Sequence, residues 1–198
     1  MTNNFDLFKE YISNEFPNFD KQHDSYFTIE IVRRGKDNPD LPAANYHFKT
    51  YFVNRLEDID KFKEEIITVC NTLKMRAYIS INRKSYHQVT LDTAAEYARR
   101  IAEHDYKKPY SIFESCTGKY LDKSDKRWVV DIDENLNPED YISLITEKKI
   151  IARVPTRSGI HLITRPFRRD DFFEKLEELG LPKIDILPNH LSLLYENL

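Results

Sequence analysis

The sequence predicts an α+β protein with two lobes, a mixed α/β lobe at residues 1–110 and a second lobe at 111–198. In the first half, stretches of alternating apolar residues indicate strands. They are separated by stretches whose apolar residues recur at helical spacing. In the second half, strand and helix patterns follow one another at short intervals. Both halves therefore mix the two types of secondary structure within compact lengths of chain.

Each element of the first half follows from local pattern. Residues 26–32 and 47–53 alternate apolar and polar side chains, and the loop between them is rich in turn formers, which predicts a hairpin. Asn54 is the expected N-cap of the next helix. Helices are expected at 5–16, 57–73 and 90–104, strands at 26–32, 47–53 and 76–82, and a loop or hinge between the lobes at 105–125.

The second half predicts the order strand, helix, strand, strand, helix, strand, which is the βαββαβ arrangement of ferredoxin-like and RRM-like folds. Gly180 marks the end of the second helix. Strands are expected at 127–133, 149–154, 160–165 and 183–187, helices at 138–147 and 170–179, and a last strand at 191–195. This fold alone leaves function open.

Composition narrows the class of protein. The net charge of -3 over 198 residues argues against a protein that coats duplex nucleic acid, so any contact with nucleic acid should be a local patch. No apolar run approaches the ~20 residues of a membrane helix, and the first residues lack a signal-peptide pattern. Cys70 and Cys116 form no recognisable disulfide or zinc pattern. We therefore expect a cytoplasmic protein with no membrane partner.

A pair of carboxylates ends the strand at 127–133. Asp131 and Asp133 flank Ile132, so their side chains should point to the same face, about 6.5 Å apart. That spacing suits one hard cation held between them, or two cations about 4 Å apart. The alternative is a pair that caps a turn or helix, because Asn135 and Pro138 follow.

A basic hairpin follows the carboxylates. Ile160 and Leu162 should enter the core, which places His161 between them on the open face, with Arg165 further along that face. Arg157 and Arg165 are candidates for clamping a triphosphate. The other interpretation is a solvated hairpin surface. The segment contains no Asp or Glu, and its cations are Lys148, Lys149, Arg153, Arg157, Arg165, Arg168 and Arg169.

Three short motifs in order resemble those of the archaeo-eukaryotic primase superfamily, the primase-polymerases. They are Val129-Val-Asp-Ile-Asp133, Arg157-Ser-Gly-Ile-His161 and Lys183-Ile-Asp-Ile186. The resemblance covers roughly residues 125–198. It implies that the RRM-like lobe is catalytic and that the enzyme is a nucleotidyltransferase.

The resemblance also implies roles for individual residues. Asp131, Asp133 and Asp185 would be the catalytic residues and would bind two divalent ions, Mg²⁺ or Mn²⁺, whereas Ser158 and His161 would contact the nucleotide. Nucleoside triphosphates and a nucleic-acid template or primer would be the partners, with a helicase or another replication protein as a further candidate. For Asp185, a polar residue at a strand end before Pro188 is the alternative interpretation.

Two hypotheses of function follow. The first is a metal-dependent nucleotidyltransferase that adds nucleotides on a nucleic-acid template. The second is a catalytically inactive module of the same fold that binds nucleic acid or a nucleotide inside a larger assembly.

Overall fold

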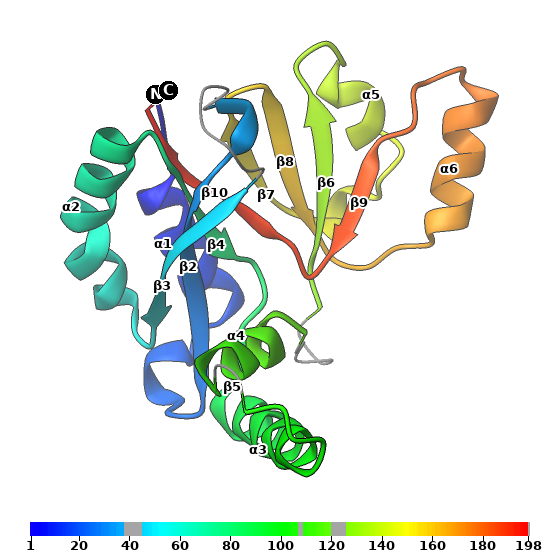
Figure 1. Ribbon diagram of the computed structural model, residues 1–198. Coiled ribbons are helices and arrows are strands. Elements are labelled where there is room, and N and C mark those ends of the chain that lie inside the picture. Colours follow the sequence, from blue (N-terminus) through cyan, green and yellow to red (C-terminus); the bar gives the residue numbers. More distant parts are fainter. Residues whose placement is uncertain (38–44, 107–108, 120–125, 198) are drawn as a thin grey trace.

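The computed structural model describes residues 1–37, 45–106, 109–119 and 126–197 and shows a mixed α+β protein with two antiparallel sheets (Figure 1). The expected α+β class is therefore confirmed. The first sheet has the order β1 (Thr2–Asn3), β10 (Leu191–Glu196), β4 (Arg76–Ser80), β2 (Ser25–Arg33), β3 (Tyr46–Val53), and β5 (Lys84–Ser85) pairs with β2. The second has the order β7 (Ile150–Thr156), β8 (Gly159–Thr164), β6 (Trp128–Asp133), β9 (Asp185–Pro188).

The first sheet is covered on one face by α1 (Phe5–Glu15) and α2 (Leu56–Leu73). Apolar residues alternate with polar ones along the strands, and every second residue of a strand points to the same side, so the apolar residues form the face that the helices cover. Phe27, Ile29 and Ile31 of β2 all enter the core beneath the two helices. The predicted hairpin is confirmed, because β2 and β3 pair in antiparallel register.

The start of α2 differs from the expected one. Arg55, not Asn54, is the N-cap residue, and the Asp58 carboxylate accepts hydrogen bonds from the main-chain N–H groups of both Asn54 and Arg55. A capping box of this kind satisfies main-chain donors that a helix leaves without partners. The sequence feature that marks the start of α2 is therefore Asp58, three positions after the N-cap residue, and not the N-cap residue itself.

A second pair of helices packs at the start of β2. They are α3 (Tyr86–Ala102) and α4 (Pro109–Lys119), and they form a small core with Tyr26 through Val89, Ile112 and Cys116. The expectation of a loop throughout 105–125 is therefore wrong at α4, whose proline lies at the first helical position, where its missing N–H costs nothing. Within the expected hinge, residues 107–108 and 120–125 lie outside the described chain.

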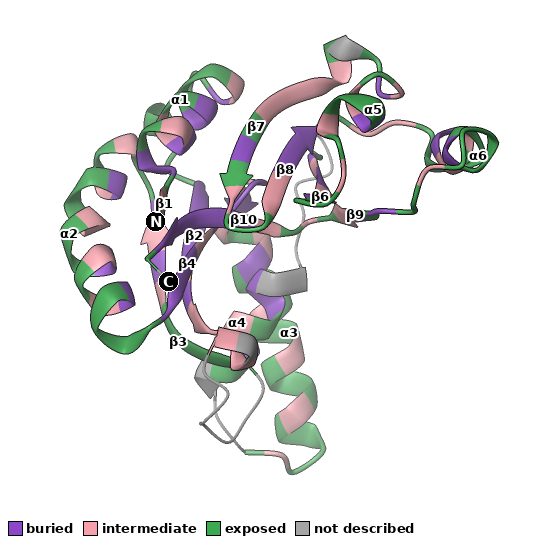
Figure 2. Ribbon diagram, turned by 90° about the horizontal axis from the view of Figure 1, so that it is seen from above, coloured by how far each residue is buried: buried purple, intermediate pink, exposed green. Residues whose placement is uncertain are grey.

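The second sheet has two covered faces. Val130, Ile132 and Leu162 pack beneath α5 (Pro138–Ile142) and α6 (Arg169–Glu178), whereas Val129 and Ile163 join the core of the first sheet. Figure 2 shows buried residues concentrated on the central strands of both sheets. Short 3₁₀ segments complete the fold at η1 (Phe19–Lys21), η2 (Gly35–Asp37) and η4 (Glu147–Lys149).

The last strand ties the two halves of the chain together. After β9 completes the second sheet, β10 returns to the first sheet and pairs with β4 and with β1 at the N-terminus. Glu15 at the end of α1 adds an ionic link, because its carboxylate accepts from Arg127 at 2.8 Å and from Arg165 at 3.0 Å. The two sheets are thus joined through both main chain and side chains. In the described ranges, no helix has the length and apolar character needed to cross a membrane.

Candidate functional site

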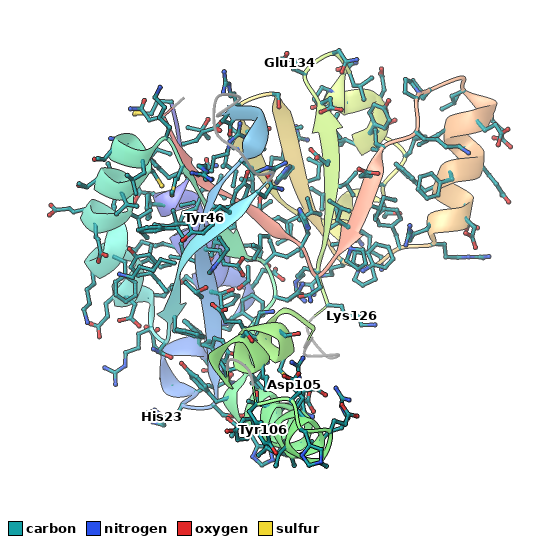
Figure 3. The ribbon with its side chains drawn as sticks, in the orientation of Figure 1. His23, Tyr46, Asp105, Tyr106, Lys126 and Glu134 are labelled. Atoms are coloured by element: carbon teal, nitrogen blue, oxygen red, sulfur yellow. The ribbon has the colours of Figure 1, made fainter. Side chains whose placement is uncertain are left out.

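A polar cavity of about 170 Å³ lies where the second sheet meets the first. We call it the polar pocket. Its walls come from β6, β8 and the β7–β8 turn on one side, and from β4 and the ends of β2 and β10 on the other. It is lined by Arg34, Arg76, Tyr78, Asp131, Asp133, Thr156, Ser158, His161, His190 and Leu193. In Figure 3 the labelled residue Glu134 marks the end of β6, because it directly follows that strand.

The carboxylate wall of the polar pocket is built by strand register. Asp131 is the direct cross-strand partner of His161 on β8 and of Asp185 on β9. Directly opposed residues share a face and have Cβ atoms about 4.5–5.5 Å apart. Asp133 lies two residues further along β6 and lines the same pocket. The sheet therefore brings Asp131, Asp133 and Asp185 to one face although the third is far away in sequence.

The three carboxylates do not form a closed cluster. Asp185 is exposed and is not among the residues that line the polar pocket. In the described part of the chain, no three His, Cys, Asp or Glu side chains are gathered closely enough to hold a metal ion. The pocket itself contains the pair Asp131 and Asp133, whose oxygens are the ligand type that Mg²⁺ and Mn²⁺ prefer.

His161 lies on the wall beside Asp131, but the expectation that it sits on an open face is wrong, because that face of the sheet packs against the first sheet and buries the ring. Its Nδ1 is 2.9 Å from the Ser192 hydroxyl, and its Nε2 is 3.4 Å from Asp131 Oδ1. Burial, with a smaller effect of His190, lowers the pKa of His161 to about 4, so the ring is neutral near pH 7. Nδ1 and the Ser192 hydroxyl share a hydrogen bond, and Nε2 lies beside the Asp131 carboxylate. His161 therefore joins the carboxylate wall to β10.

The turn between β7 and β8 places Ser158 at the mouth of the polar pocket. Gly159 has φ of +139°, and a Cβ at this position would overlap the carbonyl oxygen of Ile132 on β6. Only glycine allows so close an approach. The Ser158 carbonyl accepts from Glu134 N at 2.8 Å, which holds the turn beside the end of β6. Ser158 is thereby fixed next to Asp133.

The basic wall comes from the first sheet. Arg76 is buried and binds Asp37 through two hydrogen bonds of 2.6 and 2.7 Å, with Glu196 at 3.1 Å on the other side. Arg34 donates to the Tyr78 hydroxyl at 3.1 Å. The Arg76 guanidinium is thus engaged on all three nitrogens, and both arginines line the polar pocket together with the carboxylates of β6.

His190 closes the basic wall at the start of β10. Burial, followed by the nearby charge of Arg34, lowers the pKa of His190, and Asp185 opposes that shift. The residue therefore lies within electrostatic reach of one candidate carboxylate and one arginine. A neutral imidazole at this position can donate one hydrogen bond to an anion without adding a full charge.

The two remaining arginine candidates lie apart from the polar pocket. Arg157 is half exposed and is 3.8 Å from Asp37, at the edge of the basic wall. Arg165 lies four residues beyond His161, about 13 Å along β8, and binds Glu15. It lines a different cavity of about 460 Å³ between α1 and β7. The structure brings together Asp131, Asp133, Ser158 and His161, with Arg157 close by, but it does not bring Arg165 to them.

No family model matches the chain, and neither does any curated protein or solved structure. The functional argument therefore depends on the geometry of the polar pocket and on the sequence motifs that line it.

Six of the ten residues that line the polar pocket were not expected as site residues. They are Arg34, Arg76, Tyr78, Thr156, His190 and Leu193. One signal was present, because Arg76 and Tyr78 alternate with buried Ala77 and so share the polar face of β4. Which polar face meets the carboxylates, however, depends on how the sheets pack.

The arrangement suits a metal-bound polyphosphate. Carboxylates on one wall would hold hard cations, and arginines on the facing wall would meet the phosphate oxygens. Ligand pockets for drug-sized molecules are about 300–1,000 Å³, so a cavity of about 170 Å³ accommodates only part of a nucleotide. The remainder of such a ligand must extend outside the polar pocket.

Proposed function

We propose that the protein is a metal-dependent nucleotidyltransferase of the primase-polymerase type, which adds nucleotides on a nucleic-acid template. The observation that carries the proposal is the polar pocket, in which Asp131 and Asp133 of β6 share one cavity with Arg34 and Arg76 from the first sheet. Carboxylates alone would repel a triphosphate, and arginines alone would bind it without the metal that transfer requires. Their juxtaposition suits phosphoryl chemistry.

The topology of the second sheet supports the same proposal. Its strands follow the chain order β6, β7, β8, β9 but the spatial order β7, β8, β6, β9, and every neighbouring pair is antiparallel. With α5 and α6 as the two connecting helices, this is the pattern expected of an RRM-like lobe. Asp131 and Asp133 lie on its central strand β6, on the face opposite the helices, and Asp185 lies on the edge strand β9.

The donor set fits divalent ions that prefer oxygen. Asp131 and Asp133 would hold the metal in the polar pocket, and Asp185, the cross-strand partner of Asp131, would have to turn towards them to act as a third ligand. When bound, Mg²⁺ or Mn²⁺ would lower the pKa of the attacking hydroxyl and stabilise charge on the departing pyrophosphate. His161 Nε2 lies 3.4 Å from the Asp131 carboxylate, within reach of the metal-binding wall.

The remaining residues of the polar pocket would bind and orient the nucleotide. Arg34 presents a planar guanidinium group suited to phosphate oxygens, whereas the three guanidinium nitrogens of Arg76 are engaged by Asp37 and Glu196. Ser158 lies beside Asp133 and offers a hydroxyl donor, and the neighbouring Arg157 can reach the same anion from the edge. These groups would hold the triphosphate so that its α-phosphorus faces the primer end, which is the positioning that phosphoryl transfer depends on.

The test is incorporation of labelled nucleotides on a primed template with Mn²⁺ or Mg²⁺. We expect extension by the wild-type protein and a loss of at least about a hundredfold in Asp131→Asn and in Asp133→Asn. Asp92→Asn, which removes an exposed carboxylate on α3, is the matched control and should extend normally. Extension that persists in both β6 variants would refute the assignment of the site.

A second candidate function is a catalytically inactive module that binds a nucleotide or nucleic acid. It is favoured by the exposed position of Asp185, which leaves two rather than three carboxylates in the polar pocket. In that case the wild-type protein would bind nucleoside triphosphates but would not extend a primer under any metal condition. Binding and extension measured on the same preparation separate the two functions.

A further inference from the structure

Exposed hydrophobic side chains gather on α3, the helix at the lower end of the molecule in Figure 1. Val89 is the one buried residue of this helix, and the rest of it is exposed or half-buried (Figure 2). Nine large hydrophobic side chains are exposed in the described chain, and four of them lie on α3 or shortly after it: Leu91, Tyr97, Ile101 and Tyr106. Scattered exposed hydrophobics need no explanation, but a cluster of this kind marks an interaction surface.

The polarity of α3 is the reverse of that of an ordinary surface helix, which turns its apolar stripe to the core and its charges to solvent. The side of α3 that turns towards the body carries Glu96 and Arg100, which are half-buried. On the other side, the residues at spacings of three and four from Leu91 are all exposed and all apolar. We call this stripe the outer face of α3, and its members are Leu91, Ala94, Ala95, Ala98, Ile101 and Ala102.

The charges beside the outer face are paired with one another. Arg99 binds Glu96 at 2.8 Å and Glu103 at 2.6 Å. Arg100 binds Glu96 at 3.0 Å and Asp105 at 3.2 Å. A nucleic acid or an acidic peptide is bound through basic groups that point at it, whereas the outer face presents only aliphatic groups. The surface that covers this face must therefore be apolar as well.

The order of side-chain sizes along the outer face suits a second helix that crosses it. Ala94, Ala95 and Ala98 lie in the middle, and Leu91 and Ile101 lie towards the two ends. Two crossing helices are closest at the crossing point, where small side chains allow the approach, and they diverge on either side, where larger side chains fill the gap. A twofold axis at the alanines would place the same residues of two copies against each other, so the face is complementary to itself.

We propose that the outer face of α3 is a dimer interface, which packs against the same face of a second copy of this chain. Judged from the exposure of its side chains, two copies would bury on the order of 1,000 Å² in total, which is the lower limit for a specific interface. The dimer is therefore weak, with a dissociation constant on the order of 10–100 μM. The interface is separate from the polar pocket and forms whether or not that pocket binds a nucleotide.

The test is analytical ultracentrifugation of the full chain, from about tenfold below to about tenfold above this dissociation constant. We expect the mass to rise from that of one chain to that of two. Ile101→Glu and Ala98→Glu place a charge in the outer face, and each should raise the dissociation constant by at least about tenfold. Leu179→Glu changes an exposed leucine at the end of α6 in the same way, so it is the matched control and should dimerise as wild type does.

Cross-linking tests the same contact without relying on a loss of association. Ala98→Cys places an accessible thiol at the crossing point, whereas the native Cys70 and Cys116 are buried. The two new thiols of a twofold pair lie close together, so a short bis-maleimide should join two chains rapidly. Glu174→Cys, at an exposed position of α6, is the control and should give no more linked dimer than wild type.

Three results would overturn the dimer interface. The first is a monomer at every concentration. The second is a dimer whose dissociation constant is unchanged in both Ile101→Glu and Ala98→Glu, because it would then form through another surface. The third is equal cross-linking of Ala98→Cys and Glu174→Cys. Each variant is first shown to have the circular dichroism spectrum of wild type, so that a loss of association does not reflect unfolding.

Discussion

His161 should make the protein lose stability as the pH falls from 6.5 towards 4. Burial lowers the pKa of this histidine from 6.5 to about 4 in the folded protein. Between these values the unfolded chain binds a proton at this position and the folded chain does not. Proton uptake by the unfolded state lowers the free energy of unfolding, so the contribution of His161 is fully present above pH 6.5 and is lost towards pH 4.

The magnitude follows from the pKa difference. At about 1.4 kcal/mol per pKa unit, the interval from 6.5 to about 4 sets an upper limit of about 3 kcal/mol. Partial entry of water on protonation would reduce this, so we expect a loss of about 1–3 kcal/mol. That is a large fraction of the stability of a typical domain, which is about 5–15 kcal/mol.

The assay is urea denaturation of the wild-type protein and of His161→Asn at pH 7, 6, 5 and 4. The asparagine keeps a polar atom near the Ser192 hydroxyl but does not titrate. His87→Asn removes an exposed histidine and serves as the control. We expect the free-energy difference between wild type and His161→Asn to shrink by about 1–3 kcal/mol from pH 7 to pH 4, with the control parallel to wild type. Parallel curves for wild type and His161→Asn would refute the buried, neutral assignment of His161.

Two other substitutions test the packing around the polar pocket. Gly159→Ala should lower the free energy of unfolding by several kcal/mol, because its Cβ would overlap a main-chain oxygen of β6. Gly180→Ala is the comparison: its Cβ meets nothing within 4 Å, so it should lower the free energy of unfolding by only ~1 kcal/mol. Equal losses in the two urea titrations would contradict the close approach. Glu15→Gln should cost about 1–3 kcal/mol by weakening the link to Arg127 and Arg165, and a thermal midpoint within 1 °C of wild type would argue that this link is without consequence.

The carboxylate side of the site was predictable because it depends on strand alternation. Asp131 and Asp133 flank Ile132, and His161 lies between Ile160 and Leu162. Because the apolar residues face the helices, the polar residues must lie on the opposite face of the sheet. Once β6 and β8 pair in register, Asp131 and His161 must be neighbours. Local pattern and pairing together are enough to place this wall.

The basic side was not predictable in the same way. Arg34 and Arg76 reach the polar pocket only because β10 returns to the first sheet and fixes that sheet against the second one. No local pattern encodes the angle between two sheets. Arg165 shows the opposite error, since strand parity correctly places it on the face of His161, but its distance along β8 and its bond to Glu15 separate it from the site.

The lengths and positions of the helices could also be predicted only in part from the local sequence. The helix expected at 138–147 is shorter as α5 (Pro138–Ile142), and α4 forms where a loop was expected. In α4 the buried residues Ile112 and Cys116 are four positions apart and Phe113 packs beside them, which is helical spacing, but Pro109 and Gly118 in the same short stretch resemble loop sequence. Packing against Tyr26 supplies the stabilisation that the local sequence lacks.

The most direct test of the central claim is the effect of a nucleoside triphosphate on the melting temperature with and without Mn²⁺. At a ligand concentration of about one hundred times Kd, binding adds about 2.7 kcal/mol, which corresponds to roughly 5–10 °C for a chain of this size. We predict a shift of that order with Mn²⁺ and triphosphate together. The shift should be much smaller when EDTA replaces Mn²⁺, and it should be lost in Asp131→Asn but kept in Asp92→Asn. An equal shift with and without the metal, or a full shift in Asp131→Asn, would contradict the claim that the carboxylates of β6 hold a metal-bound triphosphate.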